Sequence, residues 1–220
     1  MDFDSNIFME TLPLFLKGTE ITLAATLLSS AIGILIATIL AIMQVSKSMP
    51  AKIFANAYIL TFRSIPLLVT IIFLYYGLPV TGLYLSAFFV GILGLALTLA
   101  AYASEVIRAG IVSIPRGQLE AAAALGLRRP HILRHVVLPQ ALMRILPPMT
   151  NQVITNLKNT SLLSAIAITD ILRTGIDVMT WKANTFSPFA AIALCYLALI
   201  IPLSILARWL EARLARRLHP

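Results

Sequence analysis

Long apolar runs separated by polar stretches dominate the chain. They occupy residues 21–45, 55–78, 83–103, 141–167 and 189–209. At about 1.5 Å per residue, a helix of some 20 residues crosses the roughly 30 Å hydrocarbon core of a bilayer. The pattern therefore predicts an all-α membrane protein with five transmembrane helices, folded as a single domain over residues 1–220.

The second and fourth runs are interrupted by polar residues and prolines. Arg63 and Pro66 lie within 55–78, and Arg144 and Lys158 lie within 141–167. We expect Arg63 to mark the cytoplasmic end of its span. Residues 105–140 carry five arginines and two histidines, so this stretch is predicted to be a loop outside the membrane.

The composition agrees with a membrane protein. Apolar residues make up 59% and charged residues 12% of the chain, whereas a soluble domain is about a quarter charged. A single cysteine, Cys195, excludes a disulfide framework and a cysteine-based zinc cluster. The acidic N-terminus has no basic n-region, so no removable signal peptide is expected.

The net charge of +8 follows the predicted topology. With five spans, the acidic residues Asp2, Asp4, Glu10 and Asp177 fall on one side of the membrane. The other side receives most of the cations, namely Lys47, Lys52, Arg63, the loop arginines, Arg208, Arg213, Arg216 and Arg217. By the positive-inside rule the N-terminus is predicted outside and the C-terminus in the cytoplasm. Orientation thus explains the charge, and no nucleic-acid partner is expected.

The 105–140 loop has the signals of two short helices. Residues 118–125 are rich in alanine, and Gly126 is suited to the left-handed conformation that ends a helix. Pro130 is suited to the start of the next helix, and Pro139 is expected to stop or turn the chain before the fourth span. The loop is either a projecting surface that a partner approaches closely or an ordinary interfacial loop.

A polar stripe marks the fourth predicted span. Gln152, Thr155, Asn156 and Asn159 are spaced i, i+3, i+4 and i+7, so a continuous helix aligns them on one face. Polar residues inside a membrane mark a substrate pathway or hydrogen-bond neighbouring helices. Both interpretations remain open for this stripe.

Other ionisable residues are weaker candidates. Lys158 is a candidate for holding a substrate carboxylate or for a structural ion pair. Glu20 is a candidate for receiving the amino group of a substrate or for lying at the hydrated membrane interface. His131 and His135 lie four residues apart, but without a third ligand they predict no metal site.

Three charged residues follow the fourth predicted span. Asp170, Arg173 and Asp177 belong either to a surface that meets a delivery protein or to a solvated surface.

The loop residues also carry a family resemblance. Glu120-Ala121-Ala122, followed by Gly126 and by Val136-Val137-Leu138-Pro139, resembles the EAA motif of the membrane subunits of bacterial ABC importers. The resemblance is closest to polar-amino-acid permeases and covers nearly the whole chain. Its supporting segments are FRSIPLLV (62–69), YYGLP (75–79), YASEVIRAG (102–110), PQAL (139–142) and LKNTSL (157–162).

The resemblance implies a non-catalytic permease subunit of the bacterial cytoplasmic membrane, with Glu120, Ala121, Ala122, Gly126 and Pro139 in the loop that couples it to an ATPase. The chain lacks a G-x-x-x-x-G-K-[ST] phosphate-binding motif, so ATP and Mg belong to the partner and no cofactor is expected here. The implied partners are two ATPase subunits, an identical or homologous second permease chain and an extracytoplasmic amino-acid-binding protein.

Two positions in the stripe bear on the substrate. Relatives that import cationic amino acids carry carboxylates that resemble this pattern at the positions of Gln152 and Asn159, and many relatives with other substrates keep Asp at the second of these positions. Amides stand there in this chain, and an amide does not neutralise a guanidinium or an ammonium group. We therefore expect a neutral or acidic amino acid. One alternative is a passive channel or exporter component, which leaves the loop unexplained. The other is a non-transporting membrane scaffold, in which the polar stripe serves only to join helices.

Overall fold

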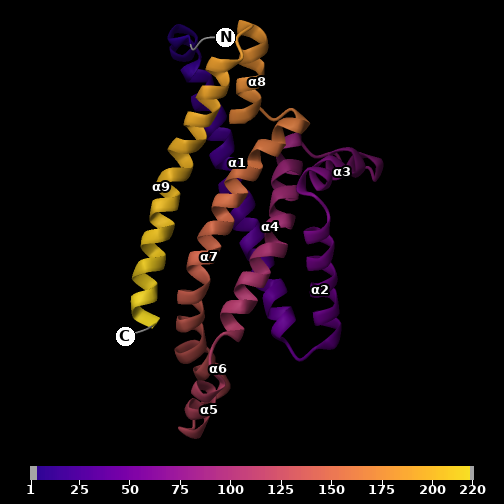
Figure 1. The fold of residues 1–220 in the computed structure, drawn as a ribbon. Coiled ribbons are helices and arrows are strands. Elements are labelled where there is room, and N and C mark those ends of the chain that lie inside the picture. Colours follow the sequence, from indigo (N-terminus) through magenta and orange to yellow (C-terminus); the bar gives the residue numbers. More distant parts are fainter. Residues whose placement is uncertain (1–3, 219–220) are drawn as a thin grey trace.

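The computed structural model describes the backbone of residues 4–218 and the side chains of residues 4–214, and every regular element in this part is helical (Figure 1). Asp2 and the side chains of Arg216 and Arg217 lie outside it. The two ends of the described chain lie at opposite ends of the molecule. In chain order the elements are α1 (Ser5–Val45), α2 (Met49–Ser64), α3 (Leu67–Val80), α4 (Ala87–Val112), α5 (Arg116–Ala124), α6 (Arg129–Ile132), the π-helical turn η1 (Leu133–Val137), α7 (Leu138–Asn159), the 3₁₀ turn η2 (Thr160–Ile166), α8 (Ile171–Lys182) and α9 (Phe186–Leu218).

Helix α1 is longer than the predicted span 21–45. It begins at Ser5, where the Asp4 carboxylate accepts a hydrogen bond from the Asn6 N–H at 2.8 Å and so caps the helix. Its 41 residues give a length of about 60 Å, roughly twice the hydrocarbon thickness. The first part of α1 therefore extends beyond the apolar segment and packs against α8 and α9.

Helices α1 and α4 form the centre of the molecule through small residues. A methyl group at Gly33 of α1 would lie only 3.0 Å from the carbonyl oxygen of Ala96 in α4, so the two backbones approach closely. Ala96, Ala100 and Ala103 are fully buried. Small side chains allow this approach, which is a common basis for helix packing in membranes.

The second predicted span is broken. Helices α2 and α3 meet at an angle of 102°, and α3 extends sideways from the bundle (Figure 1). The break follows from Pro66, which lacks an N–H and disfavours a helical conformation at the preceding residue, Ile65. The run 55–78 is therefore a bent pair of helices rather than one continuous helix.

The loop boundaries also differ from the prediction. Helix α4 runs on to Val112, so the first eight residues of the expected 105–140 loop are helical. Pro139 does not stop or turn the chain, because α6, η1 and α7 follow one another without interruption. The π-helical turn accounts for this: the Leu138 N–H bonds to the Leu133 carbonyl, and the proline lies in the first turn of α7, where its missing N–H is tolerated.

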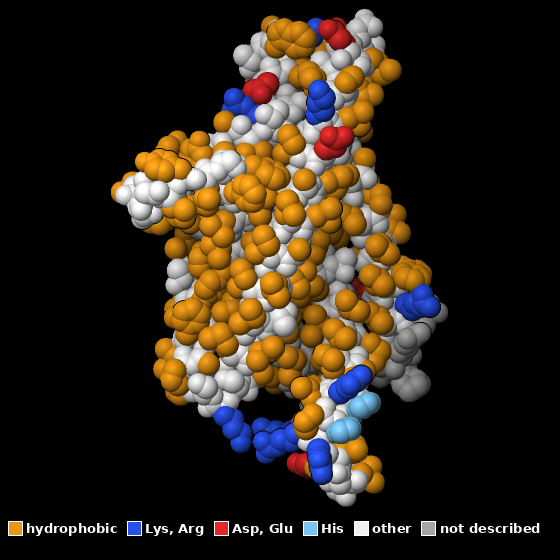
Figure 2. Space-filling view, turned by 180° about the vertical axis from the view of Figure 1, so that it is seen from behind, with side chains coloured by type: hydrophobic (Ala, Val, Ile, Leu, Met, Phe, Trp, Pro, Cys, Tyr) orange, Lys and Arg blue, Asp and Glu red, His pale blue; other side chains and the backbone are white. Residues whose placement is uncertain are grey.

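On the face shown in Figure 2, an apolar band lies between two ends that carry the charged side chains. Helix α1, helix α4 and residues Phe186–Leu214 of α9 are each long and apolar enough to cross a membrane. The bent pair α2–α3 adds a fourth candidate, whereas α7 is too polar to be one by composition. The described chain is thus an all-α protein with three or four apolar spans.

Candidate functional site

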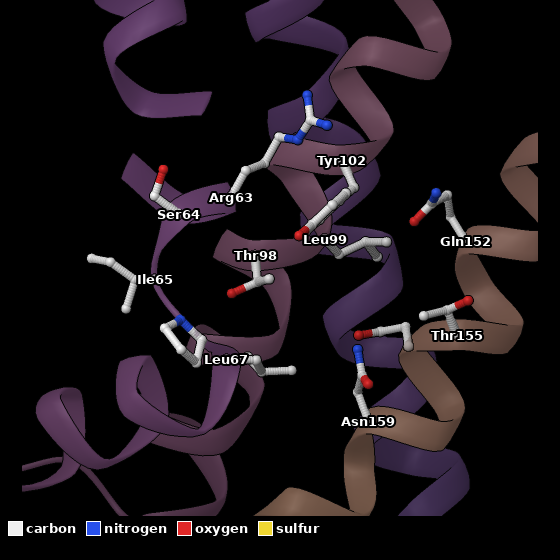
Figure 3. Close-up of a pocket in the computed structure, with 12 residues that line it drawn as sticks. Arg63, Ser64, Ile65, Leu67, Thr98, Leu99, Tyr102, Gln152, Thr155 and Asn159 are labelled. Carbon is white, nitrogen blue, oxygen red and sulfur yellow. The ribbon is translucent and has the colours of Figure 1, made fainter. Parts of the chain in front are cut away.

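A cavity of about 490 Å³ lies beside the α2–α3 break, between that break and helices α4 and α7 (Figure 3). Its walls come from three parts of the chain that are distant in sequence. They are Arg63, Ser64, Ile65, Pro66 and Leu67 at the break, Thr98, Leu99 and Tyr102 of α4, and Gln152, Thr155, Asn156 and Asn159 of α7.

The polar stripe predicted on the fourth span lines this cavity with all four of its residues. The amides of Gln152 and Asn159 point from α7 into the cavity (Figure 3). Neither side chain has a hydrogen bond to another described residue. The Thr155 hydroxyl donates to the carbonyl of Asn151 at 3.0 Å, within its own helix. Gln152 and Asn159 therefore offer unused donors and acceptors to a solute.

Asn156 differs from its neighbours in the stripe. Its side chain is 3% exposed, and its amide nitrogen donates to the hydroxyl oxygens of Ser29 at 2.8 Å and Ser30 at 3.0 Å. Both serines belong to α1. Asn156 thus joins α7 to α1, as expected of a polar residue that hydrogen-bonds a neighbouring helix.

Arg63 lies at the cavity and not at the end of its span that faces the loop. Helix α2 starts near the C-terminal end of α1 and runs about 21 Å from Met49 to Arg63. The guanidinium carbon lies 5.3 Å from the centre of the Tyr102 ring. Our expectation for Arg63 is corrected, because it assumed a continuous helix. The nearby Pro66 is the sequence signal for this placement.

The remaining polar wall is uncharged. The Thr98 side chain is 7% exposed, and its hydroxyl has no partner among the described residues. No carboxylate lines the described cavity, so Arg63 gives it a net positive charge. Thr98, Tyr102 and Arg63 were not identified as site residues from the sequence, since their role depends on contacts between distant helices.

The structure does not bring Lys158 or Glu20 to the cavity. Both side chains are exposed, and neither lines the space between α2, α4 and α7. Lys158 directly follows Leu157, which is fully buried, but its own side chain is turned to the surface.

The loop has the predicted glycine turn. Helix α5 ends at Ala124, and Gly126 adopts the left-handed conformation with φ of +80°. The Leu127 N–H donates to the carbonyl of Ala122 at 3.2 Å, and the Gly126 N–H donates to that of Ala123 at 2.9 Å. This is the hydrogen-bond pattern of a Schellman C-cap, in which glycine avoids the strain of a Cβ.

Helices α5 and α6 project beyond the C-terminal ends of α1 and α9 (Figure 1). Within this projection Ala122 is buried, whereas Glu120 and Ala121 are exposed. Leu125, which sequence reasoning did not single out, is 82% exposed beside the turn. An apolar residue next to a C-cap glycine is the signal that could have identified it.

His131 and His135 stack with ring centroids 5.8 Å apart. Nδ1 of His135 lies 3.1 Å from the carbonyl oxygen of His131, so the pair has a local arrangement on one helical turn. Among residues 4–218, no group of three or more His, Cys, Asp or Glu side chains could hold a metal ion.

Asp170 is not a surface residue, in contrast to both expectations for it. It is fully buried, and its carboxylate caps α8 by accepting the Arg173 N–H at 2.9 Å. Burial raises the pKa of this carboxyl to about 6. Arg173 and Asp177 form an exposed ion pair at 3.0 Å on the same helix. Of these three residues, Arg173 and Asp177 are therefore the ones at the surface.

Fold, polar cavity and projecting loop together define a transport subunit, and the family model agrees. Residues 12–216 match the family described as "Binding-protein-dependent transport system inner membrane component". The chain belongs to this family, and the resemblance to polar-amino-acid ABC permeases is confirmed. It is a non-catalytic subunit, and ATP hydrolysis belongs to a separate partner.

The chain is similar to several amino-acid permeases over almost its full length. It is 34% identical over 211 residues to the probable glutamine ABC transporter permease protein GlnM of Bacillus subtilis, covering 96% of this chain and 98% of GlnM. It is 32% identical over 215 residues to the arginine transport system permease protein ArtQ of the same organism, covering 97% and 98%. A crystal structure of an amino acid ABC transporter with histidines superimposes with a TM-score of 0.91 at 35% identity, over 97% of this chain and 100% of that one.

Proposed function

We propose that this chain carries a polar amino acid through an ATP-driven importer by alternating access, with neutral or acidic amino acids favoured over cationic ones. The proposal is based on the residues that line the cavity. It combines one guanidinium, from Arg63, with the amides of Gln152 and Asn159, and its described residues include no carboxylate.

The lining matches the chemistry of an amino acid that lacks a cationic side chain. The Arg63 guanidinium is suited to a bidentate contact with the α-carboxylate. The amides of Gln152 and Asn159 both donate and accept hydrogen bonds, so they suit an amide or a carboxyl side chain. A lysine or arginine side chain would find no opposite charge among these residues. The relatives' names include both glutamine and arginine, so the lining is the basis for choosing between them.

The proposed topology has five spans in the bacterial cytoplasmic membrane. The α2–α3 pair is the second span and α7 is the fourth. The polar face of α7 lines the cavity instead of facing lipid, which permits its low hydropathy. Cations gather at the end that bears α5 and α6, and the acidic residues Asp4 and Glu10 lie at the other. The positive-inside rule then favours a cytoplasmic loop and C-terminus, with the N-terminus outside.

The projecting loop is proposed to couple transport to ATP hydrolysis. Glu120 and Ala121 present an exposed surface to a partner, and the carbonyl of buried Ala122 accepts the Leu127 N–H that closes the turn. Gly126 sets the turn, and Pro139 begins the helix that leads to the cavity. Because α6, η1 and α7 are continuous, displacement of the loop is transmitted along α7 to Gln152 and Asn159.

The complete importer is proposed to contain two permease chains, identical or homologous, and two ATPase subunits beneath their loops. An extracytoplasmic binding protein delivers the amino acid. ATP and Mg bind the ATPases, whose closure moves the loops and opens the cavity to one side and then the other.

Uptake by the reconstituted importer tests the proposal. Proteoliposomes that contain the chain, its ATPase and its binding protein are supplied with labelled glutamine, glutamate or arginine. We expect ATP-dependent uptake of glutamine or glutamate to exceed that of arginine by about tenfold, the effect of one hydrogen bond to a charged group. Equal uptake of arginine would contradict the argument from the lining. Uptake that does not require ATP would contradict the importer itself.

A further inference from the structure

A second hollow lies on the side of the cavity that faces the α5–α6 loop. It has a volume of about 550 Å³, and its charged walls are Arg63, Glu105, Arg108 and Arg144. We refer to the space between these four side chains as the loop-side vestibule. Arg63 lines both this vestibule and the substrate cavity, so the two spaces adjoin at its side chain.

The single carboxylate of the vestibule is already engaged. One Glu105 oxygen accepts from Arg108 at 2.8 Å, and the other accepts from the amide of Gln44 at 2.7 Å. Glu105 therefore neutralises Arg108 and is held in place by α1 through Gln44. It contributes no further charge to the vestibule.

The two other guanidiniums form no salt bridge with a carboxylate among the described residues, and Arg63 acts on the Glu105 carboxylate only at longer range. Arg144 of α7 donates to the backbone carbonyl of Ser113, and Arg63 lies over the ring of Tyr102. Both side chains remain charged under all physiological conditions. The loop-side vestibule thus has an excess of two positive charges in a space large enough for a small anion.

We propose that the loop-side vestibule is a carboxylate site through which the transported amino acid leaves the cavity toward the loop. The inference rests on the proposed function, because it takes the ligand to be an amino acid. Arg63 contacts the carboxylate in the cavity, and a change in its side-chain rotamers carries that contact into the vestibule. Arg144 then shares the carboxylate before release, so the negative charge is paired at each step.

The position of Arg144 adds a connection to the loop. Arg144 lies one and a half turns from Pro139 at the start of α7, and its guanidinium bonds to Ser113 at the other side of the loop. It therefore spans the two chain segments that enter and leave α5 and α6. Movement of the loop displaces this charge relative to Arg63, which is fixed to α2.

The rates at which a single introduced thiol reacts with charged reagents report the charge of the loop-side vestibule. Ala109 is exposed and lines it, and Cys195 is the only native cysteine. The complete transporter with Ala109→Cys and Cys195→Ser is treated with a sulfonate-bearing and with a trimethylammonium-bearing methanethiosulfonate. For each thiol, the rate with the anionic reagent is divided by the rate with the cationic reagent. We expect this ratio to be about fivefold higher for the Ala109→Cys thiol than for free 2-mercaptoethanol, as for one to two nearby unit charges in a solvated site.

Variants at Arg144 test whether the charge of its guanidinium causes the raised ratio. Arg144→Gln should lower the ratio at least threefold, and Arg144→Lys, which retains the charge, should preserve it. A thiol at Ser48, in the exposed turn before α2, should show no response to Arg144→Gln. A ratio that equals that of 2-mercaptoethanol, or that is unchanged in Arg144→Gln, would overturn the proposal.

Protection of the Ala109→Cys thiol identifies the source of the anion. At 10 mM and constant ionic strength, L-glutamine should slow the anionic reagent at least twofold, and inorganic phosphate should not. Equal protection by phosphate would show a general anion site and would overturn the exit role. Labelling requires no transport, so it is independent of the uptake assay. Failed uptake together with a raised anionic-to-cationic ratio refutes only the proposed function. Normal uptake together with an unraised ratio refutes only the role of the loop-side vestibule.

Discussion

Two kinds of amide lie within two turns of α7 and differ in what surrounds them. Asn156 is buried and donates to Ser29 and Ser30 of α1, whereas Gln152 and Asn159 point into a cavity and have no side-chain hydrogen bond to another described residue. The same functional group therefore stabilises the helix bundle at one position and is available to a solute at two others. The neighbouring helix decides the role, and the sequence spacing alone does not.

The largest effect on transport is expected at Arg63, the one cation among the described residues that line the cavity. Arg63→Gln should reduce uptake of the favoured amino acid 10- to 100-fold, roughly the effect of removing a hydrogen bond between charged groups. Thermal stability of the purified transporter should be unchanged, because Arg63 is exposed and has no ion pair with a described residue. Arg63→Lys serves as the charge-retaining control, and equal uptake by Arg63→Gln and wild type would exclude a direct contact with substrate.

A carboxylate in the cavity should reverse the substrate preference. In Asn159→Asp the arginine-to-glutamine uptake ratio should rise about tenfold, the gain expected from one charged hydrogen bond. Asn151→Asp is the matched control, because Asn151 lies on the same helix, is exposed and does not line the cavity. A similar rise in both variants would point to a general effect of charge on uptake.

Asn156 should behave in the opposite way. Asn156→Ala removes two hydrogen bonds between α7 and α1 and should lower the free energy of unfolding in mixed detergent by about 1 kcal/mol, as for interhelical hydrogen bonds in other membrane proteins. The ratio of arginine to glutamine uptake should stay at the wild-type value. A changed ratio with unaltered stability would show that Asn156 acts on the substrate and not on the packing of α7 against α1.

The expected effect on uptake is smaller at the loop than at Arg63 or Asn159, and two glycines there provide the same kind of contrast. Gly126→Ala should cost about 1 kcal/mol because of its positive φ and should reduce ATP-coupled uptake two- to fivefold. Gly117→Ala is the control, since Gly117 lies within α5 and a methyl group there meets nothing within 4 Å. At Gly126 a methyl group also meets no neighbour, so within this chain the expected effect of Gly126→Ala comes from backbone strain in the turn and not from a clash. Equal coupling in the two variants would refute the role of the turn.

The sequence predicted features that depend on local chemistry. The spacing of Gln152, Thr155, Asn156 and Asn159 was sufficient to place them on one helical face, and Gly126 was sufficient to place the turn. Pro66 showed where the second run is interrupted, but the 102° bend depends on how α3 packs against α4. Local chemistry therefore located these features without giving their orientation.

Features that depend on distant contacts were not predicted. The serine partners of Asn156 lie more than a hundred residues away in the chain, and Arg63 reaches the cavity only because α2 ends there. Asp170 carries a charged group, and its burial follows from the packing of α1, α8 and α9. Pro139 continues a helix because η1 widens the preceding turn, an irregularity without a signal in the sequence.

The most direct test of the account is protection of a thiol in the cavity. In the transporter with Gln152→Cys and Cys195→Ser, the cavity residues predict that glutamine slows labelling by a small thiol reagent in a concentration-dependent manner, whereas arginine has little effect. The Asn151→Cys thiol, on the exposed side of the same helix, should be labelled at the same rate in the presence of glutamine and of arginine. If the Gln152→Cys protein transports glutamine and yet its thiol is not protected, the substrate binds elsewhere and the central claim is contradicted.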